Sequence, residues 1–195
     1  MEEFGGLLGL RVSDLPGVAQ VRPQDLIQYT YPSDEELERA GVTGLFLGYY
    51  LPWDGYQNAL IAQAHGFETY HRTVEGSLVN YENLDNCQTG IHDYFKFLKF
   101  GFGRATDLAC MHVRRGRLSR RDAVGLVRRL DGRYPEEYLG CSLDEILEDI
   151  DMSREDFNRV CDRFTNKKLF VCDARGALVR DRHGNLTKVN YDNPD

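Results

Sequence analysis

The stretch Gly90–Asp107 carries the densest set of side chains able to bind an anion. Lys96 and Lys99 are three residues apart, so they lie near each other on one helix face. Glycines at 101 and 103 then interrupt the helical pattern, and Arg104 follows at the start of a second helix, a position that favours anions. These residues predict a phosphate or pyrophosphate site. The alternative is a surface lysine pair and an ion pair between Arg104 and Asp107.

A long polar segment, residues 67–90, precedes this stretch. A segment of this length inside a compact domain is usually functional or disordered, and its interleaved apolar residues argue against disorder. Glu75, Asn83 and Asp85 could bind hydroxyl groups or accept protons. Turn-forming hydrogen bonds explain Asn83 and Asp85 equally well. His92, at the start of the next helix, could bind a ligand or simply cap that helix.

An apolar run at 43–50 predicts a strand covered on both faces, as in a parallel sheet. Asp54 can cap a following helix that runs through Ala64, which together gives a βα unit. Ligands of open α/β sheets bind at the carboxyl ends of the strands. Tyr50 and Trp53 could therefore stack on a sugar or base, and Asp54 could bind substrate. Core packing of the two aromatic residues and simple capping by Asp54 are the alternatives.

The rest of the chain is predicted to be mainly helical, which makes the fold class α/β and predominantly helical. A helix is expected from residue 91, and a hairpin is expected at 178–189. The predicted organisation is a partial sheet region with an active-site loop at 1–110, a helical region at 111–171 and a tail at 172–195. Serines with an acidic residue three positions later mark helix starts at Ser33, Ser119, Ser142 and Ser153.

Charge is unevenly distributed along the chain. The formal net charge is −7, which argues against a broad basic face for nucleic acid. Residues 104–133 contain nine arginines and three aspartates, whereas residues 134–162 contain ten acidic residues and two arginines. The favoured interpretation is that the two stretches pair with each other. The alternative is that some of these arginines bind a phosphate.

The five cysteines do not form a recognisable metal or disulfide pattern. Their number is odd and no two of them are separated by only two residues, so free thiols in a reducing cytosol are expected. A zinc site built from distant cysteines is the alternative. The sequence shows no run of ~20 apolar residues, and its start lacks the basic region of a signal peptide. A cytoplasmic protein without a membrane span is expected.

Four segments in order resemble the N-acetyl sugar amidotransferase family of lipopolysaccharide and nonulosonic acid pathways. The likeness extends from about Phe4 to Phe170. The segments are Tyr31–Leu37, Gly41–Asp54, Tyr81–Asp85 and Gly90–Asp107.

The resemblance implies an ATP pyrophosphatase of the PP-loop type, similar to adenine nucleotide alpha hydrolases and related to GMP synthetase. Such an enzyme uses ATP with Mg²⁺ to adenylate the acetamido oxygen of a nucleotide-linked sugar. Ammonia, supplied by glutaminase and cyclase-like subunits, then displaces AMP and leaves an acetamidino group. Pyrophosphate would contact Lys96, Lys99 and Arg104, and the catalytic residues would be Lys99, Arg104 and Asp107. The expected substrate-binding residues are Tyr50, Trp53, Asp54, Glu75, Asn83, Asp85 and His92.

The sequence departs from the family pattern in its nucleotide loop. The string Ser-Gly-Gly-x-Asp-Ser is absent, and Phe4-Gly-Gly-Leu7 lacks its serines and aspartate. The chain is therefore expected to be the C-terminal part of the fold without the first βα units, with ATP bound mainly elsewhere. The alternative is a non-catalytic module for partner docking, or a truncated remnant of the enzyme.

Overall fold

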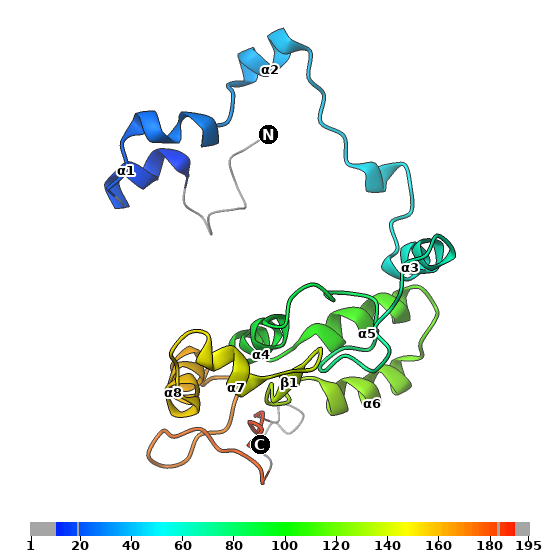
Figure 1. The fold of residues 1–195 in the computed structure, drawn as a ribbon, viewed down its shortest axis with the longest axis vertical. Helices are drawn as coiled ribbons and strands as arrows, with labels where there is room; N and C mark the ends of the chain where they lie inside the picture. Colours follow the sequence, from blue (N-terminus) through cyan, green and yellow to red (C-terminus); the bar gives the residue numbers. More distant parts are fainter. Residues whose placement is uncertain (1–10, 19, 183, 190–195) are drawn as a thin grey trace, which may run out of the picture. The chain divides into compact units, whose positions relative to one another are not determined.

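The computed structural model describes residues 11–18, 20–182 and 184–189. They fall into two compact units, with the boundary between Asp54 and Gly55. Both units are mainly helical (Figure 1). The prediction of a predominantly helical chain is therefore confirmed.

The first unit consists of short helical segments joined by extended chain. Ser33 and Glu36 form the predicted capping box, because the serine hydroxyl accepts from Glu36 N at 3.2 Å and the Glu36 carboxylate accepts from Ser33 N at 2.8 Å. The helix that they start ends at Gly41, whose φ of 65° is typical of a glycine C-cap. The elements are η1 (Val12–Asp14), α1 (Leu15–Val18), η2 (Pro23–Tyr29), α2 (Asp34–Ala40) and η3 (Leu47–Tyr49).

The strand predicted at 43–50 is wrong for this structure. Residues 43–46 are extended without a partner strand, and residues 47–49 form the 3₁₀ turn η3. Phe46 and Tyr49 are 77% and 89% exposed. A strand needs a neighbour to satisfy its backbone groups and cover its side chains, and the described part of this unit offers none.

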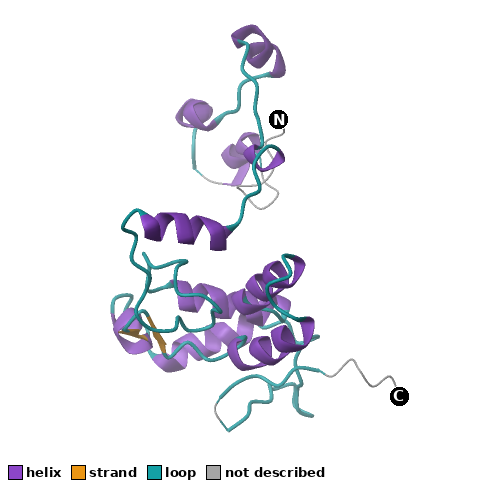
Figure 2. Cartoon of the chain, turned by 90° about the vertical axis from the view of Figure 1, so that its right-hand side faces the viewer, coloured by secondary structure: helices purple, strands orange, loops and turns teal. Residues whose placement is uncertain are grey.

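The second unit is a group of helices with one short antiparallel strand pair (Figure 2). The strands pair Glu137 with Ser142 and Tyr138 with Cys141. The parallel sheet of a PP-loop fold is not among the described elements of this unit. The elements are α3 (Gly55–Ala64), α4 (Thr89–Phe100), α5 (Arg104–Arg114), α6 (Arg120–Leu130), β1 (Glu137–Tyr138), β2 (Cys141–Ser142), α7 (Leu143–Glu148) and α8 (Arg154–Phe164).

The three serine caps predicted for this unit are confirmed. The hydroxyl groups of Ser119, Ser142 and Ser153 accept from the backbone N–H three residues later, at 3.1, 3.3 and 3.1 Å. Each cap satisfies a donor that the first turn of a helix leaves without a partner. Helices α6, α7 and α8 therefore begin where the sequence pattern places them.

The core of this unit lies between α4, α7, α8 and the tail. Helix α4 contributes the buried Tyr94, Phe97 and Leu98, and the Phe97 and Phe170 rings lie 5.4 Å apart, centre to centre. A hydrophobic stripe at helical spacing thus turns inward, as expected for an amphipathic helix. The other buried members of the cluster are Leu143, Leu147, Phe157, Cys161 and Leu186.

The tail folds back on itself as three extended segments. Arg180 pairs with Leu186 across the predicted turn, which confirms the hairpin in the described residues at 178–182 and 184–189. The third segment, in which Phe170 pairs with Lys188 and Cys172 with Leu178, was not predicted from the sequence. These pairings hold Phe170 and Leu186 against the core.

Candidate functional site

The predicted break between two helices is present. Gly101 ends α4 with a φ of 74°, and Arg104 is the first residue of α5. The anion at the start of α5, however, is a side chain of the protein itself. Asp131 Oδ2 accepts from Gly103 N at 2.8 Å and from Thr106 Oγ1 at 2.5 Å. A carboxylate here satisfies the helix dipole and therefore occupies the place expected for a phosphate.

Arg104 forms a bidentate ion pair with Asp93, not with Asp107 as the alternative interpretation had it. Nε lies 2.5 Å from Oδ2 and Nη2 lies 2.9 Å from Oδ1. The two side chains are 21% and 12% exposed. Burial works against the charge on Arg104, but the Asp93 carboxylate raises the pKa of the guanidinium above its ordinary value.

The polar loop reaches the same ion pair through Asn83. With its amide oxygen turned toward the guanidinium, Asn83 accepts from Arg104 Nη2 at 3.1 Å. Its backbone has a φ of 55°, a conformation that asparagine tolerates better than most residues. The Tyr138 hydroxyl donates to the Asn83 carbonyl at 3.3 Å, which holds the loop against β1. Asn83, Asp93, Arg104 and Tyr138 thus form one polar cluster.

A cavity of about 30 Å³ lies beside this cluster. That volume suits a water molecule rather than a sugar. Burial raises the pKa of the Glu75 carboxyl above its ordinary value, and the charge of Arg133 opposes the shift. Side chains that line the cavity include Glu75, Asp93, Arg104, Asp131, Arg133 and Glu137.

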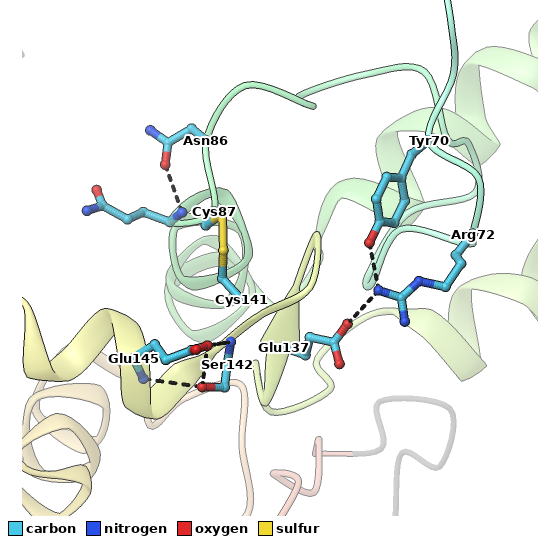
Figure 3. The surroundings of a disulfide bond; sticks show 9 residues. Tyr70, Arg72, Asn86, Cys87, Glu137, Cys141, Ser142 and Glu145 are labelled. Carbon is cyan, nitrogen blue, oxygen red and sulfur yellow. Dashed lines mark hydrogen bonds and ion pairs between the residues drawn. A yellow bond between two sulfur atoms is a disulfide. The ribbon is translucent and has the colours of Figure 1, made fainter.

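A disulfide holds the loop against the strand pair on its other side (Figure 3). Cys87 is bonded to Cys141, with their Cα atoms 6.1 Å apart. The expectation of five free thiols is therefore wrong for this pair, because folding brings together two cysteines 54 residues apart in sequence. The remaining three cysteines are free, and burial raises the pKa of Cys161 to about 12.

Arg72 makes a third link between the loop and the strand pair. Its Nη2 donates to the Tyr70 hydroxyl at 2.8 Å and lies 3.4 Å from Glu137 Oε1 (Figure 3). The loop is also closed internally, since Tyr70 N donates to the Asn80 carbonyl at 2.9 Å and Asn80 Nδ2 to the Tyr70 carbonyl at 2.7 Å. This segment therefore has a defined conformation without regular secondary structure.

The other predicted cationic residues do not converge on Arg104. Lys96 pairs with Asp107, and Lys99 is exposed, with its Nζ 5.0 Å from the centre of the Phe164 ring. Among the described residues, neither lysine pairs with the acidic partner of Arg104, Asp93. Lys96, Lys99 and Arg104 therefore each contact a different residue and do not form one cationic site.

Two of the predicted substrate residues lie at the edge of the cluster. His92 is exposed, and its Nδ1 lies 3.3 Å from Asp93 Oδ1. Asp85 is also exposed. Neither side chain lines the small cavity.

Three more of the predicted substrate-binding residues, Tyr50, Trp53 and Asp54, lie at the end of the first unit. Tyr50 and Trp53 are 69% and 73% exposed, whereas Asp54 is 5% exposed. Helix α3 starts directly after Asp54, as predicted. The exposed rings do not pack into a core in this structure.

The expected pairing between the arginine-rich and acidic stretches is wrong for the described residues. None of the ion pairs joins residues 104–133 to the carboxylates of 134–162. Those carboxylates pair instead with Arg72, Arg154, Arg159 and Arg180. The arginines of α6 are left without an ionic partner within the described chain.

Metal binding and membrane insertion receive no support from the described ranges. Within them, no three His, Cys, Asp or Glu side chains gather as metal ligands would. No helix in the same ranges has the length and apolar character needed to cross a membrane.

The helical second unit, with its ordered polar loop, contains the part of the chain that matches a known protein family. The family model described as "LPS biosynthesis protein WbpG-like, C-terminal domain" matches residues 66–180, which include the loop, the polar cluster and the core. The chain belongs to this family. No curated protein matches the chain. The family resemblance found in the sequence is thus confirmed for lipopolysaccharide biosynthesis.

Proposed function

We propose that the chain is the C-terminal part of an ATP-dependent N-acetyl sugar amidotransferase. The observation that carries the proposal is the family match over residues 66–180, together with the four sequence segments that resemble such enzymes. The substrate class is a nucleotide-linked acetamido sugar, and the product carries an acetamidino group. Glutaminase and cyclase-like subunits supply the ammonia, and the location is cytoplasmic.

The chemistry requires activation of an amide oxygen, which is a poor leaving group. Transfer of AMP from ATP to that oxygen releases pyrophosphate, and attack by ammonia then expels AMP. The attacking nitrogen must lose a proton as the C–N bond forms. Glu75 suits this task, because burial raises the pKa of its carboxyl above the ordinary value and because it also lines a larger groove of about 510 Å³, beyond the water-sized cavity.

Arg104 has a positioning role in this proposal. Its guanidinium already binds Asp93 and Asn83, so it connects the loop to α4 and α5. Residues of this chain do not fit the ATP phosphates in the manner of a PP-loop, since the sequence has no Ser-Gly-Gly-x-Asp-Ser string. We assign ATP and Mg²⁺ to a separate N-terminal part that carries this loop.

Reconstitution tests the proposal. The chain is combined with an N-terminal part carrying the nucleotide loop, ATP, Mg²⁺, ammonia and an acetamido UDP-sugar, and AMP is measured. We expect sugar-dependent AMP release that requires this chain. Glu75→Gln should lower the rate by about 10²-fold or more, as for a lost general base, whereas Glu68→Gln, an exposed neighbour, should leave it unchanged. Absence of AMP above background would favour a non-catalytic docking module.

A further inference from the structure

We propose that a groove at the C-terminal end of α6 binds a diphosphate group. The groove has a volume of about 540 Å³ and lies between α6, the end of α4 and the tail hairpin. Its cationic side chains are Arg128, Arg129, Arg133 and Lys188. A volume of this size is within the ordinary range of small-molecule sites, unlike the water-sized cavity beside Arg104.

The arginines of the groove are available for a ligand. Within the described residues, Arg128 and Arg129 have no carboxylate partner. Arg133 donates through Nε to the Arg129 carbonyl at 2.5 Å, which orients its guanidinium and leaves its two terminal nitrogens for other acceptors. By contrast, the half-buried Arg154 is bound by both Asp144 and Glu136. Within the described residues, carboxylates thus form ion pairs with Arg154 but not with Arg128 or Arg129.

Each acidic side chain of the groove accepts hydrogen bonds from the protein, and the second oxygen of Asp131, Oδ1, is buried without a partner among the described residues. Asp131 accepts through Oδ2 from the start of α5, as described above. Asp181 accepts from Asn185 N at 3.0 Å and from Asn185 Nδ2 at 3.2 Å. Four cationic and two acidic side chains leave the groove with a net positive charge.

Lys188 is exposed, but its ammonium group is held in place by two contacts. Its Nζ donates to the Gly101 carbonyl at 2.7 Å and lies 5.9 Å from the centre of the Phe97 ring. The tail hairpin carries this lysine to the groove through the pairing of Phe170 with Lys188. The cationic side chains therefore come from two separate segments that the fold brings together.

The chemistry of these side chains favours phosphate oxygens. A guanidinium presents N–H donors in a planar fork that matches a phosphate, and several such groups suit two linked phosphates better than one carboxylate. The diphosphate could be free pyrophosphate or the bridge of a nucleotide-linked sugar. Its assignment to that sugar rests on the proposed function, whereas binding of a diphosphate does not.

Titration calorimetry on the full chain tests the groove with two probes, inorganic pyrophosphate and UDP-N-acetylglucosamine. We expect saturable binding of pyrophosphate, weakened about tenfold or more in the double variant R128A/R129A. The matched control is R120A/R121A, which removes the same charge from the other end of α6, outside the groove. Arg128→Lys with Arg129→Lys should bind with intermediate affinity, because charge remains while the fork is lost.

The outcomes distinguish specific binding in the groove from non-specific attraction of an anion to surface arginines. Absence of saturable pyrophosphate binding by the wild-type chain, or an equal loss in R128A/R129A and R120A/R121A, would overturn the proposal. Binding of both probes supports a site for the sugar nucleotide, and binding of pyrophosphate alone supports a site for the released product. Because no turnover is measured, a failure of AMP release in the reconstituted enzyme leaves this result intact. Circular dichroism confirms that each variant is folded.

Discussion

Arg104 and Asp93 face each other as a bidentate pair between the start of α5 and the first turns of α4, at 2.5 and 2.9 Å. Asn83 reaches the same guanidinium from the polar loop. One arginine thus connects three segments of the family domain that residues 66–180 define. Its contribution to stability can be separated from any contribution to catalysis.

Removing either partner of this pair should destabilise the domain. Arg104→Ala and Asp93→Ala each leave a partly buried charge without its partner, and we expect each to lower the free energy of unfolding by about 2–4 kcal/mol. The double variant should lose less than the sum of the two, which urea denaturation of all three variants measures. Strictly additive losses would show that the two residues do not act together.

Gly132 should resist substitution more strongly than a glycine in open space. It has a φ of 77°, and a Cβ built on it would lie 2.3 Å from the Phe97 ring. Gly116 has a similar φ of 69° but no heavy atom within 4 Å of such a Cβ. Gly116→Ala should therefore cost about 1–2 kcal/mol from backbone strain alone, and Gly132→Ala about 1–3 kcal/mol more from overpacking. Equal losses of stability in thermal unfolding would contradict the role assigned to the ring.

The disulfide between Cys87 and Cys141 should stabilise the chain by restricting its unfolded state. A link across 54 residues is expected to contribute about 4 kcal/mol in the chain-entropy model. Cys87→Ser or added reductant should lower the unfolding temperature, and reductant should have no further effect on Cys87→Ser. Cys110→Ser serves as the control, because Cys110 is an exposed free thiol. A reductant-insensitive wild-type chain would count against the bond.

Glu75 should make the folded chain less stable as pH rises, whereas a salt-bridged acid makes a folded chain more stable as pH rises. Burial raises the pKa of its carboxyl in the folded chain above the ordinary 4.5. The stabilisation is therefore complete below the unfolded pKa and is lost as pH rises through the folded pKa. Relative to wild type, Glu75→Gln should gain stability over the interval that begins near the ordinary pKa of 4.5 and extends through the raised pKa of the folded chain, with little difference at more acidic pH. The comparison is made by denaturation at each pH, and a constant difference across that interval would contradict the shift.

Local signals in the sequence predicted the helices well, whereas contacts between distant residues could not be predicted. A serine cap and its acidic partner lie within one turn, so Ser119, Ser142 and Ser153 identify their helix starts unaided. Asp131, by contrast, caps α5 through Gly103, which is 28 residues away in sequence. The residues around Gly103 contain no signal that predicts this contact. The same holds for the pairing of Cys87 with Cys141. The break before Arg104 was predictable, but its partner depended on the packing of α4 against α5.

In the segment at 43–50, a local signal predicted the wrong structure. Its composition favours a strand, but a strand requires a neighbouring strand. Within the described residues, the Phe46 carbonyl accepts from Tyr49 N at 3.0 Å inside the 3₁₀ turn, no partner strand bonds to residues 43–46, and Phe46 is 77% exposed. Edges of this kind pair readily with other chains. The structure that this apolar segment adopts therefore depends on what covers it.

This exposed segment should cause the isolated chain to self-associate. Contiguous apolar side chains in water associate to reduce their exposed area, so Phe46→Ser with Tyr49→Ser should shift the chain toward monomer by roughly tenfold in the association constant, about 1.4 kcal/mol. The control is Ile27→Ser with Tyr29→Ser, whose side chains are 71% and 64% exposed but lie outside the run. Sedimentation over a range of concentrations measures the effect. Equal association of both variants and wild type would show that the run does not drive assembly.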